Sequence, residues 1–269
     1  MDDKIKSFQE DCAKEIKLQG NDLALKEKSL EWLLHANSKK YSYHFSWMNR
    51  PIIQYPQDIQ MMQELIMSVK PDLIIETGIA HGGSVLFSAS MLALLDLSGA
   101  LQSKKSYDPL STKRRVIAID IDIRDHNKKK ILENPFSHYI QMIEGSSIDE
   151  SIINEVSKEA SNYEKVMIFL DSNHTHEHVL KELDAYSHLT SVGSYIVVFD
   201  TVIEDLPDNL LPNSTNPSHS QARTYSSGNS PKSAVKAFLK NNTNFSIDAD
   251  IDDKLLISVA PDGYLKRIK

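Results

Sequence analysis

The sequence is poor in three features that would each indicate a class of function. With one cysteine, Cys12, in 269 residues, neither an internal disulfide nor a cysteine-based zinc site can form. No apolar run reaches about 18 residues, so no membrane span is expected, and the charged start MDDKIKSFQEDCAKEIK is not that of a signal peptide. The 30 basic and 37 acidic residues give a net charge of -7, which argues against nucleic acid or an anionic membrane as the partner. These absences predict a cytoplasmic protein and leave small, even phosphate-bearing, substrates open.

What the sequence does contain, mostly between residues 56 and 200, is a regular alternation of strand-like and helix-like segments. Short continuous apolar runs predict strands at 72–78, 114–122, 138–145, 165–171 and 194–200. Helical periods predict helices at 56–70, 82–97, 125–133, 148–160, 176–189 and 231–241. Continuous apolar strands are typical of a sheet that helices cover on both faces. The sequence therefore predicts an α/β fold with a Rossmann-like, doubly wound, mostly parallel sheet.

The segments on either side of this alternation differ from it in composition. Residues 1–55 predict an N-terminal helical and extended segment, with one or two amphipathic helices over 3–36, and residues 56–269 form the main domain. The stretch 202–231 is rich in Ser, Asn and Pro and is either a lid over a site or a solvated insertion. Near the end, FSIDADI and LLISVA (255–260) predict an edge hairpin.

The first predicted strand ends in a glycine-rich turn. Ligands of open α/β sheets bind outside the carboxyl ends of the strands, which is where ETGIAHGGS (76–84) lies. Gly78, Gly82 and Gly83 let the backbone approach a ligand, and the helix N-terminus that follows favours an anionic group. A tight strand-to-helix turn without a ligand would use the same glycines, and the pattern is not GxGxxG.

The next two strands end in groups that suit a nucleoside. The second strand ends in Asp120, with Asp122 on the same face, and either carboxylate is suited to hold ribose hydroxyls. The third ends in GSSID (145–149), where small hydroxyl residues suit an adenine pocket, although Ser147 or Asp149 is equally well explained as a helix N-cap. Together with the glycine-rich turn, these residues predict a nucleoside-cofactor site.

The stretch LDSNHTHEHVL (170–180) follows the fourth strand and contains three histidines. Asp171 ends this strand and Asp200 ends the fifth, so two carboxylates are expected side by side, either binding a divalent metal or pairing with a cation. His174 lies in the turn after Asp171 and is suited to be a general base at about pH 7, or else it is an ordinary turn residue. His176 and His178 are expected in the first helical turn as solvated or capping side chains.

Two other metal-enzyme patterns do not fit these histidines. The hydrolase motif HxHxDH needs Asp and His at 178–179, where the sequence has His178 and Val179. Iron-dependent oxygenases need HxD or HxE, and none of the ten histidines has an acid two positions later. The sequence therefore disfavours both a metallo-hydrolase of this type and an iron-dependent oxygenase.

Several segments resemble the cephalosporin hydroxylase family, and they follow one another through residues 41–269. They are PIIQYPQDIQMMQELI, KPDLIIETGIAHGGSVLFSASML, VIAIDIDIRDHN, GSSID, LDSNHTHEHVLKEL, GSYIVVFDT and PDGYLKR. This family is similar to class I S-adenosylmethionine-dependent methyltransferases, so the resemblance implies a seven-stranded sheet of that type. Related enzymes are magnesium-dependent O-methyltransferases of sugars in natural products or surface glycans, which implies a part in carbohydrate or polysaccharide biosynthesis.

The resemblance also implies roles for residues of this chain. The residues implied to bind S-adenosylmethionine are Glu76, Gly78 and Ser84 at its methionine part, Asp120 at the ribose, and Ser146 and Ser147 near the adenine. Asp171 and Asp200 are implied as magnesium ligands. His174, with Asp171, is implied as the catalytic group that deprotonates the hydroxyl of a small-molecule or glycan acceptor.

One position departs from the family pattern. Relatives usually carry a Glu-Asp pair at the end of the fifth strand, where this sequence has Phe199 and Asp200. Either water or acceptor hydroxyls take the place of the missing carboxylate, or the metal is weakly bound or absent and His174 works with Asp171 alone. Two alternatives remain: a hydroxylase, as the family name suggests, and a cofactor-binding protein that has lost turnover. A homo-oligomer is also expected, with the N-terminal helices packed between subunits.

Overall fold

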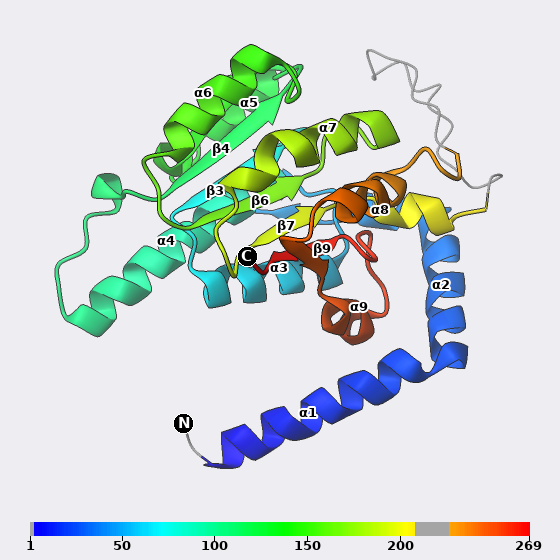
Figure 1. Cartoon of the computed structure of the whole chain (residues 1–269). Coiled ribbons are helices and arrows are strands. Elements are labelled where there is room, and N and C mark those ends of the chain that lie inside the picture. Colours follow the sequence, from blue (N-terminus) through cyan, green and yellow to red (C-terminus); the bar gives the residue numbers. More distant parts are fainter. Residues whose placement is uncertain (1–2, 208–225) are drawn as a thin grey trace.

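The computed structural model describes residues 3–207 and 226–269, and in this part of the chain the core is a seven-stranded sheet (Figure 1). The strands, in spatial order, are β5 (Ile140–Glu144), β4 (Arg115–Asp120), β3 (Leu73–Thr77), β6 (Val166–Leu170), β7 (Tyr195–Val198), β9 (Tyr264–Arg267) and β8 (Phe245–Ile247). Neighbours from β5 to β7 are parallel, and β9 is antiparallel to both β7 and β8. The predicted doubly wound, mostly parallel sheet is confirmed.

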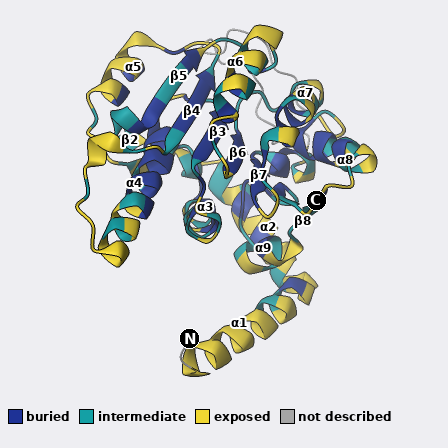
Figure 2. Cartoon of the chain, turned by 60° about the vertical axis from the view of Figure 1, so that its left-hand side comes forward, coloured by how far each residue is buried: buried dark blue, intermediate teal, exposed yellow. Residues whose placement is uncertain are grey.

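Helices cover both faces of this sheet, and Figure 2 shows the strands buried between them. One layer contains α3 (Pro56–Val69), α4 (Gly83–Ser103) and α5 (Asp125–Leu132). The other contains α6 (Glu150–Ala160), α7 (His176–Tyr186) and α8 (Pro231–Asn241). Along β3, Ile74 packs into the first layer while Leu73 and Ile75 pack into the second, because successive side chains of a strand leave opposite faces.

The order of the strands reverses between β3 and β6. From β3 the chain passes through α4 to β4 on one side, whereas β6 leads through α7 to β7 on the other. This is the topological switch point, and ligands of open α/β sheets bind outside the carboxyl ends of the strands at such a point. Four of the predicted site segments follow strands that end at this edge.

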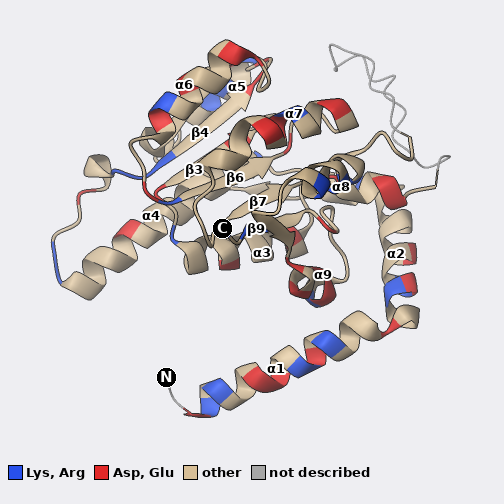
Figure 3. Ribbon diagram, in the orientation of Figure 1, with Lys and Arg blue, Asp and Glu red and all other residues tan. Residues whose placement is uncertain are grey.

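The N-terminal segment contains two helices, where the sequence predicted one or two. Helix α1 (Asp3–Asn21) runs along the outside of the molecule, carries charges of both signs along its length (Figure 3) and contacts α9 (Ala249–Leu255). Helix α2 (Leu23–Asn37) returns to the body and is followed by the 3-10 helix Tyr41–His44 and the short strands β1 (Ser46–Trp47) and β2 (Arg50–Pro51). The predicted N-terminal helical extension is confirmed.

The predicted closing hairpin is wrong in its second strand. Residues 249–255 form α9, and the strand that pairs with β8 is β9, further along the chain. The segment after α9 is instead held as a loop, because the buried carboxylate of Asp58 accepts hydrogen bonds from the Ser258 hydroxyl (2.6 Å) and the Val259 N–H (3.0 Å). A backbone donor used in this way is not available to a strand ladder.

Two further expectations meet the structure only in part. Of the predicted insertion 202–231, residues 208–225 lie outside the described part of the chain, and the remainder begins with the 3-10 helix Thr201–Asp205 and ends at α8. Among the described residues, α4 alone has the length and hydropathy of a membrane span, with a mean hydropathy of 1.7. Half of that stretch is buried inside the protein, as in the core helix of an α/β sheet.

Candidate active site

The glycine-rich turn after β3 brings the loops of β3 and β6 into contact. Gly78 has a φ of +97°, and a Cβ atom there would lie 2.0 Å from the carbonyl oxygen of Asp171. Only glycine fits a position with this φ and this close an approach. Gly82, with a φ of +83°, caps the start of α4, whose first turn contains Ser84. The turn therefore lies directly beside the loop that carries the predicted catalytic residues.

Asp120 at the end of β4 holds this turn in place. Its Oδ2 accepts hydrogen bonds from the backbone N–H groups of Ile79 (2.8 Å) and Ala80 (3.2 Å). Asp122 lies beyond the end of the strand, is mostly exposed and forms an ion pair with Arg124 at 3.5 Å. The sequence left open whether Asp120 or Asp122 would bind the ribose. The structure places Asp120 at the glycine-rich turn and Asp122 at the surface.

Two residues that the sequence did not indicate hold the turn from its other side. Asn127 of α5 donates to the carbonyl of Ala80 (2.8 Å), and Arg50 of β2 donates to the carbonyl of His81 (2.9 Å). Arg50 also donates to the side-chain oxygen of Asn127 (2.6 Å), so β2 and α5 hold the turn together. Asn127 is buried. The sequence indicates its role only in that Asn127 is an uncharged polar residue on the inner face of an otherwise basic helix.

The two serines predicted near the adenine lie in different surroundings. Ser146 is partly exposed in the turn after β5, where its carbonyl accepts from the N–H of Asp149 (3.0 Å). Ser147 is buried, and its hydroxyl donates to Glu182 of α7 (2.5 Å). The N-cap of α6 is Asp149, whose side chain makes no capping hydrogen bond, so the N-cap explanation does not apply to Ser147.

Glu76, on β3, is a buried carboxyl group with one oxygen satisfied by serines of α4. Ser88 donates to its Oε2 (3.1 Å), and Ser84 also forms a hydrogen bond to it, while Oε1 has no partner among the described residues. Burial raises the pKa of Glu76 to about 7, against the opposing effect of the two serines. The fold therefore resists the charge on this carboxyl unless a cationic group lies next to it.

A small cavity of about 10 Å³ lies beside Glu76, room for about one water molecule. Its lining residues are Gln54, Met62, Glu76, Ser84, Ser88, Phe169, Asp171 and Phe199. It joins the glycine-rich turn to the loop after β6, so the predicted cofactor residues and the predicted acidic site are neighbours.

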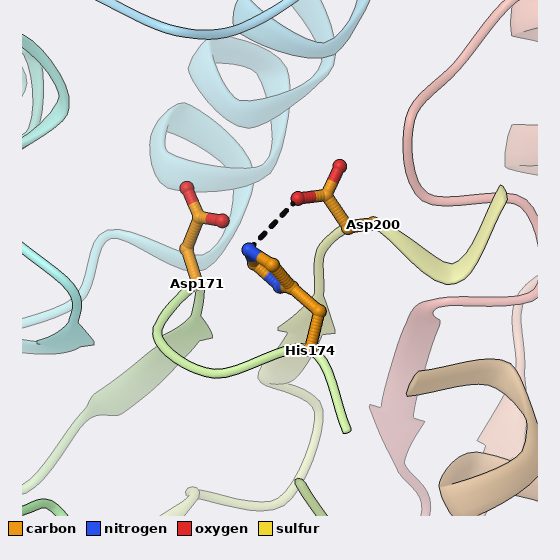
Figure 4. A group of neighbouring side chains, drawn as sticks. All are labelled: Asp171, His174 and Asp200. Atoms are coloured by element: carbon orange, nitrogen blue, oxygen red, sulfur yellow. Dashed lines mark ion pairs between the residues drawn. The ribbon is translucent and has the colours of Figure 1, made fainter. Parts of the chain in front are cut away.

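The acidic site consists of Asp171, His174 and Asp200, drawn in Figure 4. One possible metal-binding atom from each residue lies within 4.8 Å of the others, and His174 Nε2 is 3.0 Å from Asp200 Oδ2. The carboxyl ends of the adjacent parallel strands β6 and β7 bring the two acids together, as the sequence predicted. Asp200 has a left-handed φ of +56°, an uncommon conformation for a residue other than glycine that is often found at functional sites.

The electrostatics of this site favour a bound cation. Burial, followed by the charges of Asp200 and Glu76, raises the pKa of Asp171 well above its usual range, while a hydrogen bond from Gln54 opposes the rise. That bond, from Gln54 Nε2 to Asp171 Oδ2, measures 3.0 Å. Two carboxylates with open coordination positions are the donor set that a hard divalent ion such as Mg²⁺ takes, with water completing its shell. The residues present therefore fit the predicted metal.

Phe199 leaves no third carboxylate beside this pair. It is buried and packs edge-to-face on Phe169 of β6, with ring centroids 6.2 Å apart. The buried amide of Gln54 lines the same cavity and donates to Asp171, and nothing in the sequence singled it out from the extended segment 41–55. Tyr43, from the same segment, is near enough that burial and the charges of Asp200 and Asp171 raise its pKa.

The two remaining histidines of LDSNHTHEHVL do not reach the acidic site. His176 Nδ1 lies 2.7 Å from the hydroxyl of Ser233 in α8, and the backbone N–H of His176 donates to the side-chain oxygen of Asn229 (3.0 Å). His178 Nε2 lies 3.1 Å from the hydroxyl of Ser147 and 3.4 Å from Glu182. Both lie in the first turn of α7, as expected. The expectation that they are solvated or capping side chains is wrong, because each contacts side chains of other segments and holds the helix to them.

A seven-stranded sheet with one antiparallel strand, a glycine-rich turn after β3 and an acid at the end of the neighbouring strand β4 is the class I methyltransferase fold. The chain belongs to the family described as Rhamnosyl O-methyltransferase/CmcI, whose model matches residues 39–268. The resemblance inferred from the motifs is therefore confirmed.

Individual relatives agree with this family. A rhamnosyl O-methyltransferase of Mycobacterium bovis is 26% identical over 217 residues, which are 78% of this chain and 73% of the relative. One of Mycobacterium leprae is 26% identical over 163 residues, 60% of this chain and 62% of the relative. Among solved structures, CmcI with magnesium and S-adenosylmethionine superposes with a TM-score of 0.52 at 15% identity, covering 84% of this chain and 78% of CmcI. The apo structure of CmcI gives 0.51 at 17% identity, with 84% and 77% covered.

Proposed function

We propose that this protein is an S-adenosylmethionine-dependent O-methyltransferase that acts on a hydroxyl group of a sugar or glycosylated molecule with the help of a divalent metal. The observation that carries the proposal is the Asp171–His174–Asp200 group, which lies beside the glycine-rich turn at the switch point of the sheet. Relatives named rhamnosyl O-methyltransferase, and the magnesium and S-adenosylmethionine complex of CmcI, support the reaction and both cofactors.

The cofactor site in this proposal lies over the carboxyl ends of β3, β4 and β5, on one side of the switch point. Gly78, Gly82 and Ser84 accommodate the methionine part at the start of α4, Glu76 lies where it can neutralise the cationic amino group, and Asp120 binds the ribose. Ser146 is the better placed of the two serines for the adenine, because the hydroxyl of Ser147 is committed to Glu182. S-adenosylmethionine supplies an activated methyl group, so most of the catalysis by the protein is orientation.

The acidic site prepares the acceptor hydroxyl, which is a poor nucleophile while it keeps its proton. A divalent metal on Asp171 and Asp200 would lower the pKa of a coordinated hydroxyl. His174 accepts the proton, and Asp200, 3.0 Å from its Nε2, orients the imidazole and stabilises it once charged. Tyr43 is exposed near the two acids and offers one wall for the acceptor, because sugar rings pack well on aromatic faces. The other aromatic side chains of 41–55 pack into the core or against it.

Two rival functions have less support. A hydroxylase would need an iron site, and the described residues bring together two carboxylates and one histidine rather than two histidines and one carboxylate. A protein that binds the cofactor without turnover is favoured by Phe199 alone, and the remaining acids and the histidine still converge.

The test is methyl transfer from isotope-labelled S-adenosylmethionine to a panel of alkyl rhamnosides and other glycosides, with magnesium or with EDTA. We expect a labelled methyl ether with at least one glycoside, in amounts that fall when EDTA removes the metal. Binding of S-adenosylhomocysteine with no transfer to any acceptor would favour the inactive cofactor-binding protein. An absence of binding would refute the proposal altogether.

A further inference from the structure

Glu182 is a buried acid at the centre of a hydrogen-bond cluster that lies next to the proposed site but is not part of it. The residue belongs to α7 and is fully buried. Its Oε1 accepts hydrogen bonds from the hydroxyls of Ser147 (2.5 Å) and Ser172 (2.6 Å). His178, one turn earlier in the helix, lies 3.4 Å from the same oxygen.

The two serines belong to different loops of the carboxyl edge. Ser147 follows β5 in the loop that contains Ser146, and Ser172 follows Asp171 directly in the loop that leads to His174. The hydroxyl of Tyr186, one turn after Glu182, donates to the carbonyl of Ser147 (2.5 Å) and fixes the first loop a second time. A single carboxylate oxygen therefore joins the loop proposed to contact the adenine to the loop that carries the acidic site.

Packing alone does not explain an acid at this position. The other inward residues of α7 are Val179, Leu183 and Tyr186, and an apolar residue at 182 would fill the space without burying a carboxyl group. Replacing a buried charge by a well-packed apolar group is often neutral or stabilising. The hydrogen bonds from Ser147 and Ser172 explain why an acid is present at position 182, since hydrogen bonds to a carboxylate are stronger and better directed than those between neutral groups.

We propose that Glu182 is a positioning residue that fixes the loop after β5 and the loop after β6 relative to each other, so that the cofactor and the Asp171–His174 pair meet in register. This role rests on the proposed methyl transfer. In this role Glu182 acts through Ser147 and Ser172.

The role predicts a division of effects between the two serines. Ser147→Ala should raise the KM for S-adenosylmethionine about tenfold and change kcat little, because one hydrogen bond to a charged group is lost from the adenine side. Ser172→Ala should lower kcat and leave that KM nearly unchanged. Glu182→Ala should do both, with kcat falling on the order of 10²-fold, the typical cost of misplacing catalytic groups by about 1 Å.

Asp58→Ala is the matched control for a loss of stability. Asp58 is also fully buried and accepts hydrogen bonds from Ser258, Val259 and Tyr264, but it belongs to α3 on the opposite face of the sheet. Both alanine variants should lower the melting temperature by a similar amount. Glu182→Gln keeps an oxygen that can accept from both serines and should restore most of the kcat that Glu182→Ala loses.

Hydrogen exchange measures the positioning itself, whether or not an acceptor is known. The amides of Gly145, Asp149, Asp171 and Thr175 are hydrogen-bonded in the two loops. They should exchange faster in Glu182→Ala and not in Asp58→Ala. Unchanged exchange in both loops, with Glu182→Ala and Asp58→Ala equally destabilised, would overturn the role of Glu182. If the wild-type protein transfers no methyl group, the proposed function fails, and the exchange rates together with S-adenosylhomocysteine affinity still decide the role of Glu182.

Discussion

Replacing Glu76 by glutamine should make the stability of the protein much less dependent on pH. Burial raises the pKa of Glu76 from 4.5 to about 7, so between these values the folded state keeps a proton that the unfolded state releases. Unfolding in this range therefore releases a proton, and stability falls as the pH rises. The stability is fully present below about pH 4.5 and is lost as the pH passes through about 7.

The size of the effect follows from the shift. A rise of about 2.5 pH units, at about 1.4 kcal/mol for each, corresponds to about 3 kcal/mol of stability lost between pH 4.5 and pH 7. Glutamine has nearly the same shape and can still accept the hydrogen bond from Ser88, but it does not ionise. Glu76→Gln should therefore be about 3 kcal/mol less sensitive to this change of pH than the wild type.

Urea denaturation at about pH 5 and about pH 8 measures this difference, together with the change at Asp171, whose pKa is no longer raised by the charge of Glu76. Titrating groups that do not interact with Glu76 are common to both proteins and cancel. Glu155→Gln, which alters an exposed acid of α6, is the control and should follow the wild type. An equal loss of stability from pH 5 to pH 8 in Glu76→Gln and in the wild type would refute a raised pKa of Glu76 as the cause.

Three further predictions concern the acidic site. His174→Ala should keep its affinity for S-adenosylhomocysteine and lose on the order of 10²- to 10⁴-fold in kcat, and an unchanged kcat would show that His174 is not the base. Asp200→Asn should weaken magnesium binding at least about tenfold by calorimetry, because one of two carboxylate ligands is neutralised; an equal affinity would place the metal elsewhere. Phe199→Glu should melt at a lower temperature without metal, because it loses its packing on Phe169 and adds a charge beside Asp171, and magnesium should raise its melting temperature more than that of the wild type. An equal response of both proteins to magnesium would mean that position 199 does not face the metal.

The strands of the sheet were predictable because burial on both faces gives each parallel strand a continuous apolar run. The closing hairpin was not, because its outcome depends on Asp58, which holds Val259 across 201 positions of sequence. The helix at 249–255 contains three acids, at 250, 252 and 253, and one buried side chain, Ile251, so its sequence has neither a clear helical nor a clear strand period.

The residues of the candidate site were likewise predictable only in part. Asp171 and Asp200 were predictable as neighbours because each ends a strand of one parallel sheet, and parallel strands end at one edge. Gln54, which contacts Asp171 across 117 positions, and the Arg50–Asn127 pair, 77 positions apart, depend on the path of the N-terminal segment over the sheet. No local pattern in the sequence records that path.

A crystal structure with S-adenosylhomocysteine and Mn²⁺, located by its anomalous signal, tests the proposed site most directly. We expect the nucleoside between the ends of β3 and β4 with its ribose on Asp120, and the metal on Asp171 and Asp200 within reach of His174. A cofactor bound away from the glycine-rich turn, or a metal that contacts neither carboxylate, would contradict the account.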